Sequence, residues 1–263
     1  MYKLNTIDNI KLLQFTCFEK TGVVRHALST RHGGVSTGEA ATMNFGFNRK
    51  DTAENIKENF RRLLTAVDMN YENVVLPNQT HSDVVHVVTM EDAGKGLHKT
   101  SDIKGVDALI TNVPNIPICV FHADCMPILF LDVKNKAIGI AHSGWKSTVL
   151  NIASKTVEAM RDNYRSDPMD IICAVGPSIG SCHFEVDEDV AALFGTDFTV
   201  ARRKEKNHVD LWGVVKKQLV DAGISEQNIA MSSICTVCNK DIYYSYRGDN
   251  HKTGSMISVM EIV

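Results

Sequence analysis

The sequence of 263 residues predicts a layered α/β or α+β fold, and three observations support this class. Short apolar runs with turns between them fill the middle of the chain, which is typical of a large mixed or antiparallel sheet. Segments of helical period separate some of these runs. No Pro/Gly/Ser-rich linker and no internal repeat divides the sequence, so we expect a single domain over residues 1–263.

The predicted strands share an apolar run that is bounded by turn residues. They are the segments 23–30, 73–77, 83–88, 107–111, 116–121, 126–133, 136–141, 170–175, 228–238, 239–246 and 255–262.

Three helices are predicted between them. Asp51 is expected to cap a helix over 53–67, with Glu54 as its capping-box partner. The helical period of 146–164 predicts one continuous helix. Asp210 is expected to cap a third helix, which ends near Gly223.

The composition limits the possible partners. The formal net charge of −3 argues against the electrostatic attraction that nucleic-acid binders use, so small molecules are the expected partners. No apolar run reaches about 18 residues, so no membrane span is expected. The N-terminal segment lacks the apolar core of a signal peptide. We therefore expect a cytoplasmic protein, and in a reducing compartment the seven scattered cysteines would be thiols, metal ligands or nucleophiles.

Reactive side chains stand at the ends of the most apolar segments. His81 lies in the polar loop NQTHS, Cys125 follows Asp124 in HADCMP, and His142 ends the run AIGIA. One thiolate and two imidazoles with an open fourth position would form a catalytic zinc site. The spacings of 44 and 17 residues are not a short-range metal signature, so a structural role for each residue remains open.

Other motifs are ambiguous. Arg31 in a Gly-rich loop and Arg247 in SYRGDN can receive phosphate or be solvated surface residues. Trp145 offers an aromatic face to a base. Cys182 is a candidate site residue, but adjacent Cys182 and His183 would point to opposite faces of a strand and would not act together. The Cys-x-x-Cys at 235–238 has no second pair to complete a four-cysteine site, so structural thiols are expected.

Seven of these segments together resemble the YfiH-like family, which was first described as laccase-domain polyphenol oxidase and is now regarded as purine nucleoside phosphorylase. They are STRHGGVSTG, NQTHSDVV, DALIT, ADCMPI, AHSGWKST, VGPSIGSCHFEV and CTVCNKDIYYSYR, in this order. The resemblance spans nearly the whole chain and implies a single-domain α/β/β/α sandwich with mixed sheets.

The resemblance also implies a site and an activity. His81, Cys125 and His142 match the family's metal ligands, with Zn²⁺ expected and copper possible in vitro. The implied reactions are phosphorolysis of adenosine, inosine and 5′-methylthioadenosine to base and ribose-1-phosphate, and deamination of adenosine. We expect purine nucleosides and phosphate as partners, and a monomer or homodimer.

Roles for the remaining residues follow from their chemistry. Arg31 or Lys146 would orient phosphate, Asn44 would hold ribose or base, and Asp124 would transfer a proton. The chain departs from the family around the tryptophan, where Ser143, Lys146 and Ser147 stand in place of Ala and Arg-Gly. Lys146 keeps the charge of an arginine but loses its bidentate fork.

Three alternatives remain. A metal-free cysteine hydrolase would use Cys125 as nucleophile and His142 as base. A copper-dependent polyphenol oxidase would use the same donors, but the ten histidines form no His-x-His pair of the kind that multicopper sites use. A non-enzymatic protein would only bind a nucleoside.

Overall fold

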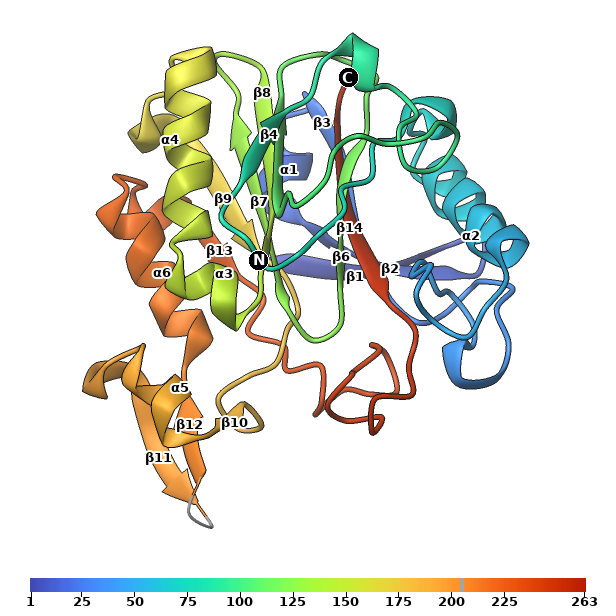
Figure 1. Cartoon of the computed structure of the whole chain (residues 1–263). Coiled ribbons are helices and arrows are strands. Elements are labelled where there is room, and N and C mark those ends of the chain that lie inside the picture. The colour runs from blue at the N-terminus through green and yellow to red at the C-terminus, as the bar shows by residue number, and fades with distance from the viewer. Residues whose placement is uncertain (204–205) are drawn as a thin grey trace.

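The computed structural model describes residues 1–203 and 206–263, and its strands form two large sheets that pack face to face (Figure 1). The first sheet has the order β1 (Tyr2–Ile7), β2 (Ile10–Phe15), β3 (Val24–Ser29), β14 (Met256–Ile262) and β6 (Ile118–His122). The second has the order β13 (Ile229–Met231), β9 (Ile171–Val175), β7 (Met126–Asp132), β8 (Ala137–Ser143), β5 (Ala108–Thr111) and β4 (Val85–Val87). A small sheet of β10 (Glu185–Val186), β12 (Lys206–Val209) and β11 (Thr199–Arg203) projects from one end (Figure 1).

Helices cover the outer faces of both large sheets. α2 (Ala53–Ala66) packs on the first sheet, and α4 (Ile152–Tyr164) and α6 (Leu211–Asp221) pack on the second (Figure 1). The shorter helices are α1 (Thr16–Glu19), α3 (Trp145–Val149) and α5 (Glu188–Ala192). Single 3₁₀ turns lie at Gly38–Ala40, Tyr71–Asn73, Met90–Asp92, Pro168–Asp170, Thr196–Phe198 and Glu226–Asn228. The layers are therefore α/β/β/α, which confirms the predicted fold class.

The layering follows from strands that are apolar on both faces. In β7, Ile128 and Phe130 face the helices, whereas Leu129 and Leu131 face the other sheet. Successive side chains of a strand point to opposite faces, so a continuous apolar run requires a partner layer on each side. Each such buried side chain contributes about 1.5–3 kcal/mol relative to exposure.

Two predicted strands are wrong, and the strand predicted over 228–238 covers only Ile229–Met231. Residues 73–77 contribute only an isolated bridge between Val75 and Ile118, and residues 239–246 form turns. The side chains of Tyr243 and Tyr244 are buried beside Met256, so this segment is apolar because it covers the core and not because it pairs in a sheet. The edge strand β1 was not predicted, because its residues are mostly exposed and lack an apolar run. β2 and the three strands of the small sheet were not predicted either, although most residues of β2 are buried.

Helix boundaries also differ from the prediction. Thr52 caps α2, since its Oγ1 accepts from the Asn55 N–H at 3.2 Å, while Asp51 accepts from the Thr52 N–H. The segment 146–164 is broken at Asn151, which has φ 62°, a left-handed conformation that asparagine tolerates. Asp210 caps α6 as predicted, by accepting from the Gly213 N–H at 3.1 Å. Within the described ranges, every helix is too short or too polar to cross a bilayer.

Candidate metal centre

Strand register brings the three predicted ligands to one end of the second sheet. Cys125 immediately precedes β7, and Pro127 of β7 pairs with His142 of β8. Ala141 of β8 pairs with Ala108 of β5, whose parallel neighbour β4 follows the loop that carries His81. Three residues far apart in the sequence therefore converge because their strands are neighbours.

The three donor groups lie close enough to share one ion. One ligand atom from each of His81, Cys125 and His142 lies within 4.8 Å of the other two. Cys125 Sγ is 3.7 Å from His81 Nε2, and the two imidazole centroids are 4.9 Å apart. Around a tetrahedral zinc, a sulfur and a nitrogen ligand would be about 3.6 Å apart. The donor set fits zinc, and it also fits copper.

A buried carboxylate orients this cluster. His142 Nδ1 donates to Asp107 Oδ1 at 2.7 Å, which leaves Nε2 as the atom free to bind an ion. Asp107 also accepts the backbone N–H groups of Thr80, His81 and Ser82. The same side chain therefore fixes the imidazole of one candidate ligand and the loop of another, an arrangement typical of metal sites.

The charges of these groups depend on one another. Burial would raise the pKa of the Cys125 thiol, but the His142 and His81 imidazoles lower it to about 6. Burial would lower the pKa of His142, but the Cys125 thiolate and the Asp107 carboxylate raise it to about 9. Burial would likewise raise the pKa of Asp107, but its bond to His142 lowers it to about 2. Cys125 is therefore largely a thiolate at neutral pH, the form that binds metals and attacks electrophiles.

Gly144 makes room for the cluster. A Cβ atom at this position would lie 2.5 Å from His81 Cδ2 and 3.0 Å from Cys125 Sγ. The backbone approaches both ligands so closely that a side chain would displace them.

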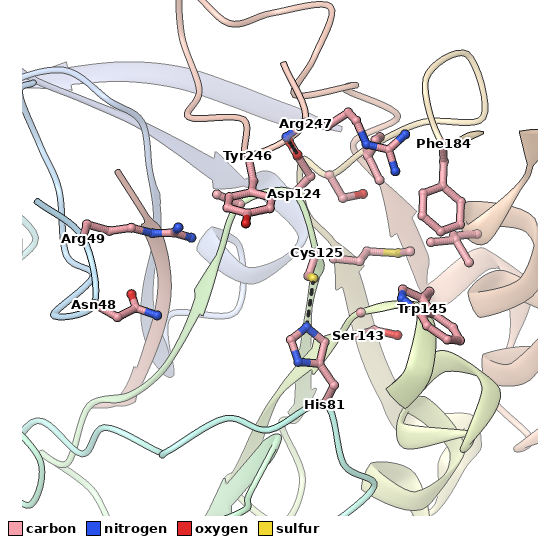
Figure 2. A pocket seen from close by; sticks show the side chains of 16 residues that line it. Asn48, Arg49, His81, Asp124, Cys125, Ser143, Trp145, Phe184, Tyr246 and Arg247 are labelled. Atoms are coloured by element: carbon pink, nitrogen blue, oxygen red, sulfur yellow. Dashed lines mark hydrogen bonds between the residues drawn. The ribbon is translucent and has the colours of Figure 1, made fainter. Parts of the chain in front are cut away.

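His81 and Cys125 of the cluster line a cavity of about 380 Å³ (Figure 2), and His142 lines the second cavity described below. Trp145 and Phe184 form part of an apolar wall on one side of Cys125, while Asn48, Arg49 and Tyr246 lie on the other side (Figure 2). A second cavity of about 340 Å³ shares His81, Cys125 and Arg49 with the first. Arg49 therefore lies on the side opposite Trp145 and Phe184, while the Arg247 guanidinium lies on the side of Phe184 (Figure 2).

Some of the other predicted residues reach the cavity. Trp145, Asp124 and Arg247 line it. Both carboxylate oxygens of Asp124 are already used, since they accept from Thr236 Oγ1 at 2.6 Å and from the Arg247 N–H at 2.8 Å. Asp124 therefore holds the C-terminal loop in place, and proton transfer by this residue would require one of these bonds to break.

Four predicted residues lie away from the described linings of both cavities: Arg31, Asn44, Lys146 and Cys182. Arg31 donates to the Lys240 carbonyl and lies over the Tyr244 ring. The buried Asn44 side chain accepts from the N–H groups of Gly46 and Ser255 and donates to Asp51. Lys146 is exposed beside Trp145, and Cys182 lies beside Cys238.

Sequence reasoning missed three residues of the site, namely Asp107, Arg49 and Tyr246. Arg49 lines both cavities, donates to Ser255 Oγ at 3.2 Å and lies over the Tyr246 ring at 5.2 Å. Nothing local distinguishes Arg49 from a surface arginine. Asp107 could have been identified from the sequence, because an aspartate at the start of a buried strand requires hydrogen-bond partners.

Comparisons with known proteins place the chain among related sequences and structures. The family described as multi-copper polyphenol oxidoreductase laccase matches residues 25–263. The chain is 31% identical over 258 residues to a purine nucleoside phosphorylase of Bacteroides thetaiotaomicron, covering 94% of this chain and 95% of that protein. It is 37% identical over 242 residues to a purine nucleoside phosphorylase of Deinococcus radiodurans, covering 90% and 88%. The crystal structure of the Bacillus licheniformis hypothetical protein YfiH is similar with a TM-score of 0.92 at 30% identity, covering 100% and 99%.

Proposed function

The chain belongs to the family described as multi-copper polyphenol oxidoreductase laccase, and we propose that it is a zinc-dependent purine nucleoside phosphorylase. The proposed substrates are adenosine, inosine and 5′-methylthioadenosine with phosphate, and the products are the free base and ribose-1-phosphate. The observation that carries the proposal is the convergence of His81, Cys125 and His142 on a cavity that Arg49 also lines. Relatives named purine nucleoside phosphorylase supply the reaction class.

Phosphorolysis requires the cavity to position the purine, the ribose and the phosphate. The bond from C1′ to the purine nitrogen breaks, its electron pair goes to the purine, and a phosphate oxygen bonds to C1′ through an oxocarbenium-like state. We assign the purine to the apolar wall of Trp145 and Phe184. A bound zinc ion would supply a Lewis acid at the base of the cavity.

We assign phosphate to Arg49, in place of the Arg31 or Lys146 expected from the sequence. Arg49 lines both cavities, and the contacts of its guanidinium with Ser255 and Tyr246 fix its position. A fixed guanidinium recognises phosphate oxygens through paired hydrogen bonds. Arg49→Met should raise the KM for phosphate about tenfold or more, because a charge-assisted hydrogen bond contributes about 1.5–3 kcal/mol. Lys146→Met is the matched control and should leave this KM near its original value.

We also propose deamination of adenosine as a second activity of the site. In that reaction water adds at C6 and ammonia departs, so the product is inosine and no phosphate is consumed. Omitting phosphate therefore separates the two activities, since base release should stop while inosine still forms.

A single assay tests the proposed function. Protein incubated with adenosine and phosphate should release adenine and ribose-1-phosphate, as measured by chromatography, and elemental analysis of the same sample should find zinc. Absence of base release with all three nucleosides would overturn the phosphorylase proposal. Oxygen consumption with a phenol by a copper-loaded sample would instead support the polyphenol oxidase alternative.

A metal-free cysteine hydrolase is the second candidate. The proximity of Cys125 to the two imidazoles and the lowered pKa of its thiol favour it. Metal-free protein that retains full turnover and loses it on alkylation of Cys125 would support the hydrolase. Loss of turnover on chelation, with recovery on addition of Zn²⁺, would support the metal enzyme.

A further inference from the structure

A second group of metal-binding side chains lies outside the centre described above. It consists of Cys182, His183, Cys235 and Cys238, and one ligand atom from each lies within 4.8 Å of the others. The sequence expectation that Cys182 and His183 point apart is wrong, because the two residues lie in a turn and not in a strand. Their side chains approach to 3.2 Å between Sγ and Nδ1.

Sheet topology explains this convergence. The first two residues belong to the loop after β9, and the two others belong to the loop after β13. β9 and β13 are parallel neighbours, so their carboxyl ends meet at the same edge of the sheet (Figure 1). A parallel bridge between Ser178 and Cys235 continues the pairing into the loops.

The distances between the donor atoms fit a single tetrahedral ion. Around a zinc ion, two sulfur ligands would be about 3.8 Å apart, and a sulfur and a nitrogen ligand about 3.6 Å. Cys182 Sγ lies 3.7 Å from Cys238 Sγ. His183 Nδ1 lies 3.7 Å from Cys235 Sγ and 3.5 Å from Cys238 Sγ. These three separations match a tetrahedral ligand shell, and the Cys182 Sγ–His183 Nδ1 separation of 3.2 Å is shorter and would widen on metal binding.

The backbone around Cys235 supports the same conclusion. The Gly180 N–H donates to Cys235 Sγ at 3.4 Å, and the Asn239 N–H donates to the Cys235 carbonyl at 3.2 Å. The first bond would stabilise a thiolate and orient it, as groups around metal ligands do. The second closes the tight turn that brings Cys238 back toward Cys235.

We propose that Cys182, His183, Cys235 and Cys238 bind a structural Zn²⁺. Three thiolates and one imidazole form a closed shell that leaves no position for a substrate, which distinguishes a structural from a catalytic zinc site. Soft sulfur donors in tetrahedral array select zinc over hard cations. A disulfide between Cys182 and Cys238 would leave the converging His183 and Cys235 without a shared function.

The ion would brace one wall of the cavity. The His183 carbonyl accepts from Arg247 Nη1 at 3.2 Å, and Arg247 lines the cavity together with its neighbour Tyr246. Binding would fix the loop after β9 against the loop before β14 and so hold these two side chains in place. The proposal does not depend on which reaction the cavity performs.

Metal content tests the proposal on full-length protein that is freed of any affinity tag and loaded with Zn²⁺ alone. The original chain should hold two ions per chain, Cys125→Ala one, Cys238→Ala one, and the double variant none. Cys17→Ser is the matched control, because this thiol belongs to neither cluster, and it should retain two ions. Cys182→Ser repeats the measurement from the other loop in case Cys238→Ala fails to fold.

Two further readouts separate this site from the first. Cobalt bound to Cys125→Ala should give stronger sulfur-to-metal charge transfer than cobalt bound to Cys238→Ala, because the remaining site has three thiolates and not one. Cys238→Ala should also lower the midpoint of thermal unfolding. Absence of an ion from Cys125→Ala, or a Cys182–Cys238 disulfide found by intact mass in place of metal, would overturn the proposal. Failure of the nucleoside assay with two ions present would overturn the proposed function alone.

Discussion

The two clusters of Cys and His differ in the elements that carry them. His142 lies within a central strand and Cys125 precedes another, whereas all four members of the second cluster lie in loops. The first cluster has three donors beside a cavity, and the second has four. Loops can close around an ion from all sides, while strand ends leave one side open. The open arrangement suits chemistry and the closed one suits stability.

Removal of one thiol from each cluster gives the largest expected contrast. Cys125→Ala should reduce nucleoside turnover by at least about 10³-fold, because a catalytic metal contributes several kcal/mol of transition-state stabilisation. Cys238→Ala should lose much less turnover at temperatures where it stays folded, because the second ion would act on the cavity only through the loop that contacts Arg247. Steady-state rates of phosphorolysis at saturating substrate measure both. Equal losses in the two variants would contradict the division into an open and a closed site.

Asp107, which accepts a hydrogen bond from His142, provides a second test. Its removal should affect the open cluster alone, since the closed cluster consists only of Cys and His. Asp107→Asn should weaken zinc binding or turnover about 10–100-fold, the usual cost of removing a group that orients a metal ligand. Competition with a chromophoric chelator measures the affinity. Asp92→Asn is a control, because this buried aspartate pairs with Lys95 outside both clusters. Unchanged affinity in Asp107→Asn would show that the orientation of His142 is unimportant.

Thiol reactivity in the metal-free protein sharpens the comparison. Burial and the neighbouring Cys235 and Cys238 thiols raise the pKa of Cys182 to about 12, whereas that of Cys125 is about 6. At pH 7 iodoacetamide should therefore alkylate Cys125 at least about tenfold faster, although Cys182 is more exposed. Labelling of Cys125 should fall about tenfold per pH unit below 6, as the thiolate is protonated.

Peptide mass spectrometry of a labelling time course measures both rates. Faster labelling of Cys182 would mean that exposure, and not ionisation, decides which cluster reacts first.

The loss of folding stability at low pH is the smallest expected effect. It limits the pH range in which the two clusters can be compared. Burial lowers the pKa of His26 to about 4, and its neutral ring accepts the Phe15 N–H at 2.7 Å. An unfolded histidine has a pKa of about 6.5, so between these values the unfolded chain binds a proton that the folded chain does not. Stability therefore falls as the pH decreases, by about 1.4 kcal/mol at pH 5.5 from this residue.

His26→Gln retains an acceptor for Phe15 but does not titrate in this range. Its free energy of unfolding, measured with urea at pH 7 and at pH 5.5, should fall less than that of the original chain. An equal decrease in the free energy of unfolding of the two proteins between pH 7 and pH 5.5 would exclude His26 as a source of acid sensitivity.

The sequence predicted much of the fold and only part of the site. The central strands were found because their apolar runs are buried on two faces, as Leu129 and Phe130 illustrate. The segment 239–246 was wrongly predicted as a strand for the same reason, because Tyr244 is buried although it lies in a loop. Arg49 could not be recognised, because its position against Tyr246 depends on two loops that are far apart in the sequence.

The amino-acid sequence alone determined which side chains can bind a metal and which segments must be buried. The first depends on residue type, and the second on the spacing of apolar residues along the chain. Tertiary structure decided which donors share an ion. His81, Cys125 and His142 meet because β4, β5, β8 and β7 are successive neighbours, and the second cluster forms because β9 and β13 run parallel. Strand order is set by packing over the whole core, and local sequence does not encode it.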